Sequence, residues 1–391
     1  MKVKIINEIL GKLDSTYTRR VLGDMIKINS VVANEGELAH YLKEELGAIG
    51  LECEMHHVEP NRPNIYGRMR GESPGRRLNF NGHTDTVPIV EGWDFDPFTP
   101  IVQDGKMYGL GSCDMKGGIA CTLNMLRAIS NSGHTLQGEL SFSGVIDEEA
   151  HGKGAKAMLE TDFAGVDAIV LAEPYPGDES KPIPLGITGK ILYDIKVKGK
   201  AAHGFRPQLG INAVEDAGKI LANLDKLQYM NHPDFGTGNY STLKIEGGYE
   251  VYSVIVPASC RFEVNRLIVP GETVQSAIDD MRRLIDSLGL DSEIEVGIKP
   301  PRYEAYVMSK DEEIIGVFDP IYREVMGKAP SYEHAYGITD ANIFAGEGGI
   351  PCLHLGPQRG GAHQGNEYVQ LDWLPHISEM FTRIAVEFLG H

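Results

Sequence analysis

Hydrophobic patterns of two different periods alternate along the chain up to about residue 180. Apolar residues at helical spacing, as in residues 35–50, are followed by short apolar runs that are typical of strands. Three such runs cover residues 77–82, 138–146 and 167–174. Helices that alternate with strands in this way predict an α/β domain with a central sheet, and this is the fold class we expect.

A different order of elements interrupts this pattern from about residue 186 to about residue 300. Periodicity there predicts a strand, a helix, two strands, a helix and a last strand, in residues 190–200, 211–224, 241–248, 251–266, 273–288 and 292–298. This is the ferredoxin-like order. The α/β pattern then resumes, so we expect a discontinuous α/β domain of residues 1–185 and 301–391 with an inserted α+β domain of residues 186–300.

The charge balance limits the partners of the protein. The 391 residues include 37 Lys and Arg against 55 Asp and Glu, which gives a formal net charge of −18 at pH 7. Such a chain repels the phosphates of nucleic acids and anionic lipids. We therefore expect neither nucleic acid nor membrane as a partner.

The cysteines and the first residues bear on the compartment. Five scattered cysteines without a CxxC pair disfavour both a disulfide framework and a cysteine zinc site. Residues 1–14 have apolar residues at helical spacing, interrupted by Glu8 and Asp14, which predicts an amphipathic helix rather than a signal peptide. No apolar run approaches the roughly 18 residues that span a bilayer. We expect a soluble, cytoplasmic protein.

Polar residues follow the three strand-like runs of the α/β domain. His83 follows the first run, residues 147–149 follow the second, and Glu173 follows the third. In open α/β sheets, ligands bind at this edge. His83 and Asp85 are two residues apart, so in an extended segment they point to the same side. A carboxylate beside an imidazole commonly fixes a ring that holds a metal.

The glycine-rich run YGLGSCDMKGG has two possible interpretations. Gly109 and Gly111 begin a GxGxxG match, but Asp114 takes the third glycine position and would repel a pyrophosphate. A dinucleotide site is therefore disfavoured. Asp114 instead lies at a predicted junction between loop and helix, with Gly117 and Gly118 allowing close packing behind it. Taken alone, an aspartate at such a junction is typical of a helix N-cap.

The remaining polar sites also have simple interpretations when each is taken alone. The carboxylates of residues 147–149 are typical of a solvated helix start, and His363 is typical of an exposed loop histidine. Together, two histidines and three carboxylates lie at strand ends or adjoining loops: His83, Asp114, Glu149, Glu173 and His363. Zinc accepts these donors, and one shared carboxylate lets five side chains hold two ions. Two ions activate a water and polarise a carbonyl, while a spare carboxylate accepts the proton.

Six segments occur in the order seen in one known enzyme family: HTDTVP, GLGSCDMKGG, DEE, LAEP, KGKAAHGFRP with GINA, and HQGNEYV. On these segments, essentially the whole chain resembles the M20 metallopeptidases. That family includes aminoacylase, acetylornithine deacetylase, succinyl-diaminopimelate desuccinylase and carboxypeptidase G. The segments are specific jointly, although none of them identifies the family by itself.

The resemblance implies a role for each of the five metal-ligand candidates. The residues matching His83 and Glu173 hold one metal in such enzymes, and those matching Glu149 and His363 hold the other. The aspartate matching Asp114 bridges the two ions. The resemblance thus implies two divalent ions as cofactors, with zinc as the expected metal and cobalt able to substitute.

The resemblance also implies further functional residues. Asp85 would orient His83, and Glu148 would be the general base. The family has a cis peptide bond after the bridging aspartate, which would fall between Asp114 and Met115. The histidine matching His203 comes from the partner subunit of a dimer and stabilises the oxyanion. The inserted domain would then serve as both lid and dimerisation module, and we expect a homodimer.

Three departures from the family pattern concern the contacts to substrate. Asn265 and Leu267 replace an acid and an arginine of the family's DRRLVPGET segment, and residues 254–257 lack the asparagine of the family's NVIP. Asn342 stands where aminoacylases often have arginine. Arg266 remains the candidate for binding a substrate carboxylate, because its fork of donors matches two oxygens.

The leading hypothesis is a two-metal hydrolase that cleaves an amide next to a free carboxylate, in an N-acyl amino acid or a short peptide. One alternative is a non-catalytic binding or scaffolding protein that retains the fold. A degenerate protein of that kind would have lost Glu148 or a ligand, and this chain retains all of them. Another alternative is an aminopeptidase with a single metal, which the bridging aspartate and the insertion disfavour. The sequence leaves the acyl group open.

Overall fold

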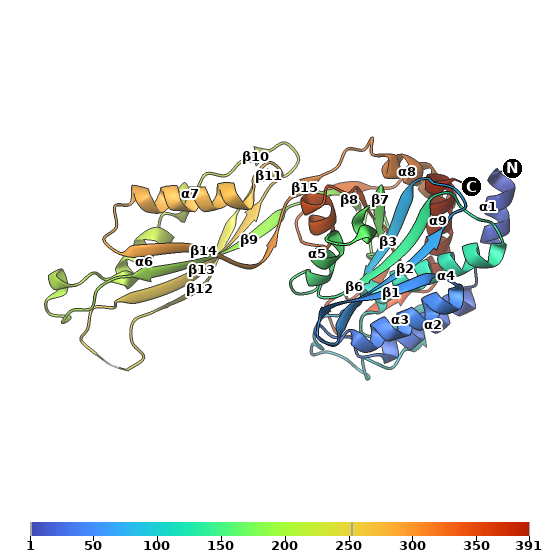
Figure 1. Cartoon of the computed structure of the whole chain (residues 1–391). Helices are drawn as coiled ribbons and strands as arrows, with labels where there is room; N and C mark the ends of the chain where they lie inside the picture. The colour runs from blue at the N-terminus through green and yellow to red at the C-terminus, as the bar shows by residue number, and fades with distance from the viewer. Residues whose placement is uncertain (1, 252, 391) are drawn as a thin grey trace. The chain divides into compact units, whose positions relative to one another are not determined.

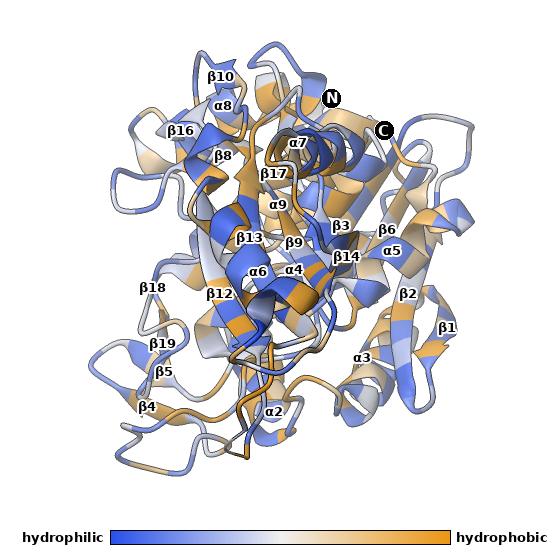
Figure 2. Ribbon diagram, turned by 90° about the vertical axis from the view of Figure 1, so that its left-hand side faces the viewer, coloured by the Kyte–Doolittle hydropathy of each residue, from blue (hydrophilic) through white to orange (hydrophobic). Residues whose placement is uncertain are grey.

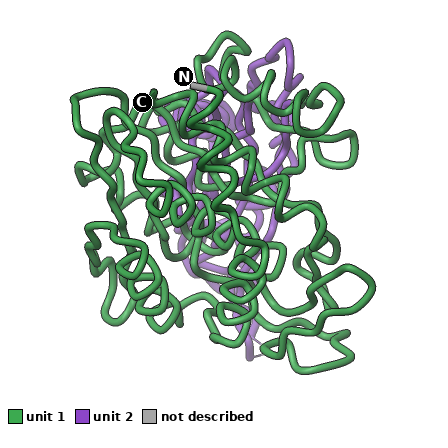
Figure 3. Tube along the Cα trace, turned by 90° about the vertical axis from the view of Figure 1, so that its right-hand side faces the viewer, with its two compact units in different colours: residues 1–185, 308–333, 339–391 green, residues 186–307, 334–338 purple. Residues whose placement is uncertain are grey.

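The chain folds into two compact units (Figure 3), seen in a computed structural model that describes residues 2–251 and 253–390. The first unit comprises Met1–Leu185, Met308–Glu333 and Thr339–His391, and the inserted unit comprises Gly186–Val307 and His334–Ile338. Hydrophobic periodicity puts the second junction near residue 300, whereas β14 (Glu293–Tyr303) carries the inserted unit beyond that point. The return of residues 334–338 is too short to leave a periodic signal.

The first unit is built on a six-stranded sheet with the strand order β1-β2-β6-β3-β7-β17 (Figure 1). The strands are β1 (Glu52–Glu59), β2 (Arg62–Arg70), β6 (Glu139–Val145), β3 (Arg77–His83), β7 (Ala168–Leu171) and β17 (Cys352–His354). The last four run parallel to one another, whereas β1 and β2 pair antiparallel. Because parallel strands end at the same edge, the residues that follow β3, β6 and β7 come together.

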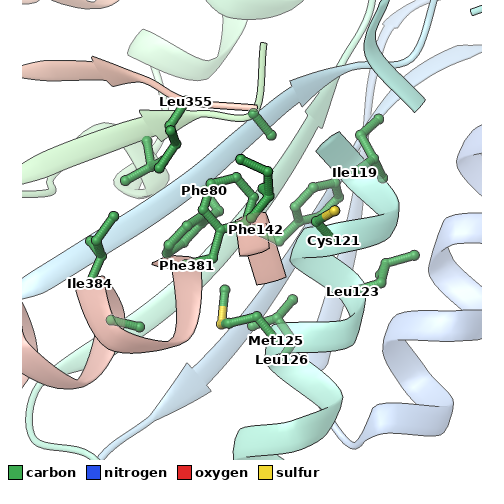
Figure 4. Packing of buried hydrophobic residues seen from close by; sticks show 14 of the residues in the cluster. Phe80, Ile119, Cys121, Leu123, Met125, Leu126, Phe142, Leu355, Phe381 and Ile384 are labelled. Atoms are coloured by element: carbon green, nitrogen blue, oxygen red, sulfur yellow. The ribbon is translucent and has the colours of Figure 1, made fainter. Parts of the chain in front are cut away.

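Helices pack against this sheet to form the core of the first unit. Their bounds are α1 (Lys2–Leu10), α2 (Ser15–Lys27), α3 (Gly36–Ile49), α4 (Gly117–Ser132), α5 (Lys153–Leu159), α8 (Glu313–Met326) and α9 (Trp373–Leu389). Figure 4 shows Phe80 of β3 and Phe142 of β6 among side chains of α4 and α9. The rings of Phe80 and Phe381 meet edge to face with centroids 5.0 Å apart. This contact fixes α9 against the central strands.

Gly118 explains how α4 approaches the sheet so closely. A Cβ atom at this position would lie 1.8 Å from the carbonyl oxygen of Ala172, just beyond β7. Only glycine fits there, which confirms the close packing expected behind Asp114. The start of α4, and with it the loop that carries Asp114, is thereby held at the ligand-binding edge of the sheet.

Shorter elements complete the first unit and its borders. A small sheet has the order β18-β19-β5-β4, with β18 (Arg359–Gly360), β19 (Tyr368–Gln370), β5 (Lys106–Tyr108) and β4 (Ile101–Gln103). The strands nearest the junctions are β8 (Ile183–Ile187), β15 (Tyr306–Val307) and β16 (Tyr332–Ala335). None of the helices formed by the described residues is long and apolar enough to cross a membrane.

The inserted unit has the expected ferredoxin-like order of elements. It consists of β9 (Gly189–Lys198), α6 (Ala213–Leu221), β12 (Tyr240–Gly247), β13 (Ser259–Ile268), α7 (Val274–Ser287) and β14. Its four-stranded antiparallel sheet has the order β12-β13-β9-β14. The banded colouring of β13 and α7 in Figure 2 shows hydrophobic residues alternating with hydrophilic ones. The hydrophobic residues form a separate core for this unit, and the predicted fold class is confirmed.

One edge of the inserted sheet lies open. Every residue of β12 is exposed, including Leu243 and Ile245, which are 58% and 51% exposed. An exposed edge strand with apolar side chains is a surface that other strands can pair with. This feature bears on the expected dimer.

Candidate metal centre

The parallel strands bring the predicted ligands to one edge of the sheet. His83 is the last residue of β3, Glu149 lies in the turn after β6, and Glu173 lies just beyond β7. The Nε2 atom of His83 is 3.8 Å from Oε1 of Glu173, and both side chains are buried. Polar groups buried at the end of a strand need partners, so this placement is unusual for residues with only a structural task.

Asp114 lies between the two histidines of the predicted site. Its Oδ1 atom is 3.1 Å from Nε2 of His83, and its Oδ2 atom is 3.6 Å from Nε2 of His363. The N-cap residue of α4 is Lys116, so Asp114 does not cap the helix. The peptide bond between Asp114 and Met115 is cis, as the resemblance implies. The two oxygens of one carboxylate thus address two different imidazoles.

Glu149 pairs with the second histidine. Its Oε1 atom is 3.0 Å from Nε2 of His363. The His363 side chain is 54% exposed, whereas the His83 side chain is 1% exposed. The cluster therefore has one buried end, with His83 and Glu173, and one end that reaches solvent, with Glu149 and His363.

Burial and crowding shift the pKa values of these groups strongly. Burial raises the pKa of Glu173 to about 8, and the neighbouring Asp114 carboxylate adds to the shift. Burial also raises the pKa of Glu148 well above its usual range; the charge of His83 opposes this shift and that of Glu173 adds to it. Hydrogen bonds to Asp114 and Glu149 raise the pKa of His363 to about 10. Carboxylates exceed cations here, as in sites that bind metal ions.

Burial and hydrogen bonding shift the pKa values of Asp114 and His83 in opposite directions. Burial by itself would raise the pKa of Asp114, but hydrogen bonds from His363 and His83 hold it below its usual range. Burial by itself would lower the pKa of His83, but Asp114 and the charges of Glu148 and Glu173 raise it well above its usual value. Both shifts favour the ionised forms, so the imidazole and the carboxylate attract each other.

Asp85 contacts His83 through its backbone rather than its carboxylate. Nδ1 of His83 is 2.9 Å from the carbonyl oxygen of Asp85 and 3.7 Å from the nearer carboxylate oxygen. The carboxylate instead accepts hydrogen bonds from the backbone N–H groups of Glu148, at 3.2 Å, and Glu149, at 3.0 Å. Asp85 thus touches both the imidazole and the turn after β6. Burial raises the pKa of its own carboxyl to about 6.

A second buried carboxylate holds the loop before α4. Glu367 accepts hydrogen bonds from the backbone N–H groups of Gly111, Cys113 and Asp114, at 3.1, 3.0 and 3.2 Å. Glu367 is not among the site residues predicted from the sequence. Its place in HQGNEYV, four residues after His363, was the available signal. Asp85 and Glu367 therefore have similar roles. Each accepts hydrogen bonds from the backbone of a segment that carries a candidate ligand, Glu149 in one case and Asp114 in the other.

Arg266 is sealed inside the inserted unit. The residue is 0% exposed, and its Nη2 atom donates to Oε1 of Glu272 at 2.6 Å and to Oδ2 of Asp280 at 3.1 Å. The Nη1 atom donates to the hydroxyl oxygen of Tyr193 at 3.2 Å. This placement favours an internal ion pair over the predicted role in binding a substrate carboxylate. The substitutions at Asn265 and Leu267 flank a structural arginine.

His203 lies exposed on the inserted unit. It follows β9 in a segment that forms an isolated bridge between His203 and Ile255, and its Nδ1 atom accepts a hydrogen bond from the N–H of Phe205 at 3.2 Å. Its Nε2 atom forms no hydrogen bond with the described residues. The adjacent Phe205 is 83% exposed. The structure therefore keeps this histidine outside the core of its own unit.

The donor set fits a pair of divalent cations. Ligand atoms of His83, Asp114 and Glu149 all lie within 4.8 Å of one another. Imidazole nitrogens and carboxylate oxygens in this proportion suit zinc and its neighbours. Glu173 lies beside His83 at the buried end of this group, and His363 lies beside Glu149 at its open end.

Comparison with known proteins identifies a family that matches most of the chain. The sequence profile described as peptidase family M20/M25/M40 matches residues 79–387. The chain is similar to a succinyl-diaminopimelate desuccinylase of Thioalkalivibrio sulfidiphilus, with 26% identity over 375 residues that cover 94% of this chain and 97% of the relative.

Two further relatives illustrate the range of similar proteins. An N-formyl-4-amino-5-aminomethyl-2-methylpyrimidine deformylase of Bacillus subtilis is 26% identical over 389 residues, covering 90% of this chain and 87% of the relative. Among solved structures, the Bacillus subtilis YxeP protein, described as a dinuclear metal binding peptidase, aligns with a TM-score of 0.72 and 18% identity. That alignment covers 96% of this chain and 98% of the other, so the similarity of fold spans both units.

Proposed function

The chain belongs to peptidase family M20/M25/M40, and we propose that it uses two divalent metal ions to hydrolyse an amide bond next to a free carboxylate. Membership of the family makes it a metallopeptidase-type hydrolase that acts on amide bonds. The number of ions, the class of substrate and the roles of individual residues are the proposal.

One observation carries the proposal: the carboxylate of Asp114 faces His83 with one oxygen and His363 with the other. We assign His83 and Glu173 to one ion, Glu149 and His363 to the other, and Asp114 to both. This division follows the two ends of the cluster, since each histidine lies within 4 Å of the glutamate assigned to the same ion. The dinuclear site described for the YxeP protein is consistent with it.

Bound here, the two ions would supply Lewis acidity and a water molecule that ionises near neutral pH. Glu148 follows β6, is partly buried, and is flanked by the candidate ligand Glu149. We assign to it the removal of a proton from the attacking water and the delivery of that proton to the leaving amine. Burial raises the pKa of Glu148 above its usual range.

We propose that the active enzyme is a homodimer joined through the inserted unit. The exposed strand β12, with Leu243 and Ile245 on its surface, offers an edge that pairs with its own copy across a two-fold axis. His203, exposed on the same unit, would then donate a hydrogen bond to the oxyanion in the partner's site.

The substrates we propose are N-acyl amino acids and short peptides. The relatives named above act on succinyl and formyl amides, and similar folds belong to a tripeptidase and a carboxypeptidase. The five cysteines are free, which supports our proposal of a reducing, cytoplasmic compartment.

The proposal is tested by a panel of N-acetyl, N-formyl and N-succinyl amino acids with dipeptides and tripeptides, each assayed with zinc or cobalt. The matched control is Glu148→Gln protein purified in the same way, which reports any contaminating hydrolase. We expect release of a free amine from at least one class, with a clear loss when the free carboxylate is amidated. Hydrolysis that tolerates the amidated compounds equally well would contradict the substrate class. Absence of turnover across the panel by protein that binds two zinc ions would favour the scaffolding alternative.

A further inference from the structure

The turn that carries Glu148 has an unusual backbone. Asp147, the first residue of this turn, adopts a positive φ of 71°, which is uncommon for a residue other than glycine. Its carbonyl oxygen accepts hydrogen bonds from the N–H groups of His151, at 3.0 Å, and Gly152, at 2.7 Å. A residue persists in this conformation when its surroundings hold it there.

Arg62, at the start of β2, holds the side chain of Asp147. Its Nη2 atom donates to Oδ1 of Asp147 at 2.7 Å and to Oε1 of Glu35 at 2.6 Å, and its Nε atom donates to Oε2 of Glu35 at 2.8 Å. Glu35 is 0%, Asp147 2% and Arg62 8% exposed. Ion pairs with this burial and this fork of bonds fix geometry far better than surface pairs do.

The anchors of Arg62 come from separate elements. Glu35 precedes α3, and its Oε1 atom also accepts a hydrogen bond from the N–H of Ala33 at 3.1 Å. Glu59, at the end of β1, pairs with Arg62 and accepts a hydrogen bond from Nζ of Lys153 at 2.6 Å. Lys153 begins α5, the helix that follows the turn. Arg62 is thus held by Glu35, before α3, and by Glu59, which also binds the helix that follows the turn.

Two independent contacts therefore hold three consecutive residues. Asp85 binds the backbone N–H groups of Glu148 and Glu149 from one direction, and Arg62 binds the carboxylate of Asp147 from another. Since Glu148 is the proposed base and Glu149 a proposed ligand, a change in this turn displaces both functions at once. A shift of about 1 Å in such groups is enough to cost a large factor in rate.

We propose that Arg62, acting through Asp147, is a positioning residue that sets the turn of Glu148 and Glu149 for catalysis and for metal binding. This inference rests on the proposed function. Lysine cannot replace the arginine, because a single ammonium group lacks the planar fork that reaches Glu35 along one edge and Asp147 at the same time.

The test compares Arg62→Lys with Arg77→Lys. Arg77 provides a matched control, because it donates from Nε and Nη2 to Oε1 of Glu139, at the opposite end of β6 from the turn. Calorimetric titration of metal-free protein with zinc measures the two binding steps, and steady-state kinetics with the best substrate of the panel measures kcat and KM. We expect Arg62→Lys to lower kcat by about tenfold or more with KM within about twofold, and to weaken one zinc step by about tenfold. Arg77→Lys should leave kcat and the zinc affinities within about twofold of the wild-type values.

A second variant guards against simple misfolding. Asp147→Asn keeps the shape of the side chain and removes the charge that Arg62 binds, so it should reproduce the kinetic and zinc effects of Arg62→Lys. Because both act through one contact, the double variant should lose little more than the worse single variant. Losses that multiply in the double variant, unchanged zinc binding in both single variants, or equal losses in Arg77→Lys would overturn the proposal.

The zinc titration separates this inference from the assignment of the base. If Glu148→Gln retains turnover, the proposed base is wrong, while the zinc steps of Arg62→Lys still test the positioning of Glu149. If Glu148→Gln is inactive and both Arg62→Lys and Asp147→Asn behave like wild type, the base stands and only the role of Arg62 is overturned.

Discussion

Two of the buried charged clusters, one around Arg266 in the inserted unit and one around Asp114 in the first unit, are built differently. In the inserted unit, the fully buried Arg266 pairs with Glu272 and Asp280, and Arg283 also pairs with Asp280, so two cations balance two carboxylates. In the first unit, carboxylates crowd together: burial and the charge of Asp114 raise the pKa of Glu173, and burial and the charge of Glu173 raise the pKa of Glu148. A cluster that neutralises itself is typical of structure, whereas one with surplus carboxylates is typical of a site for cations.

The difference also shows in how each cluster meets solvent. No part of the Arg266 side chain is exposed, while the cluster of the first unit opens through His363, whose side chain is 54% exposed. A sealed ion pair gives a substrate nothing to bind. An arginine in a family-like segment is therefore not identified as a functional group by its residue type alone; its partners in the fold decide its role.

The largest effect should come from Glu148→Gln. Glutamine has nearly the same shape but cannot take a proton, so kcat should fall by three or more orders of magnitude while two zinc ions still bind. Glu149→Gln, the adjacent control, should instead weaken zinc binding because a charged ligand is lost. Kinetics and elemental analysis of both variants check this division. Equal behaviour of the two variants in rate and metal content would show that the assignment within the pair is wrong.

His203→Ala tests whether the inserted unit contributes to the partner's site. Loss of one donor to an oxyanion should lower kcat by about 100- to 1,000-fold, with metal content and dimerisation unchanged. Mixing this variant with Glu148→Gln gives hybrid dimers in which one site has both native groups. Activity should return as subunits exchange. Hybrid dimers that form, as shown by tags of different mass, and yet stay inactive would rule out donation between subunits.

Arg266→Met should damage stability rather than chemistry. It leaves Glu272 and Asp280 without their cation, which should lower the free energy of unfolding of the inserted unit by about 3 kcal/mol. Zinc binding by the first unit should not change. Urea unfolding followed by far-UV circular dichroism measures the free energy of unfolding, and a zinc titration measures metal binding. A variant of wild-type stability whose KM rises strongly would restore the substrate-binding role predicted for Arg266.

The smallest predicted effect concerns His354, a buried group in the first unit. Burial lowers the pKa of His354 to about 3, so the folded state stays neutral at a pH where the unfolded chain takes up a proton. Stability conferred by the neutral ring is therefore complete above pH 6.5 and declines as the pH falls toward 3. The loss should reach about 2 kcal/mol at pH 5. Urea unfolding of wild type and His354→Gln should show this slope in the difference between them; parallel curves would contradict it.

Much of the candidate site follows from the sequence because it lies at strand ends. His83, residues 147–149 and Glu173 each follow an apolar run, and parallel strands bring such positions together whatever the rest of the chain does. The close packing at Gly118 and the ferredoxin-like order of elements could also be predicted, because each leaves a local pattern in the sequence. These elements depend on spacing within one segment, which a sequence displays directly.

The parts that escaped prediction depend on contacts between distant segments. Arg62 meets Glu35 and Asp147, which lie 27 and 85 residues away along the chain. The burial of Arg266 depends on Asp280, presented by α7 after that helix packs on the sheet. The carbonyl oxygen of Asp85 contacts the His83 ring, and its carboxylate accepts a hydrogen bond from the backbone N–H of Glu148. The alternation of side chains along a strand predicts neither contact. Tertiary packing decides these pairings.

We propose that five side chains of the first unit hold two divalent ions, with Asp114 shared between them. The most direct measurement is elemental analysis of the protein after saturation with zinc and removal of free metal. We expect close to two zinc ions per chain in the wild type, and fewer than two in Asp114→Asn. A wild-type chain that never exceeds one zinc ion at saturation would contradict the shared site.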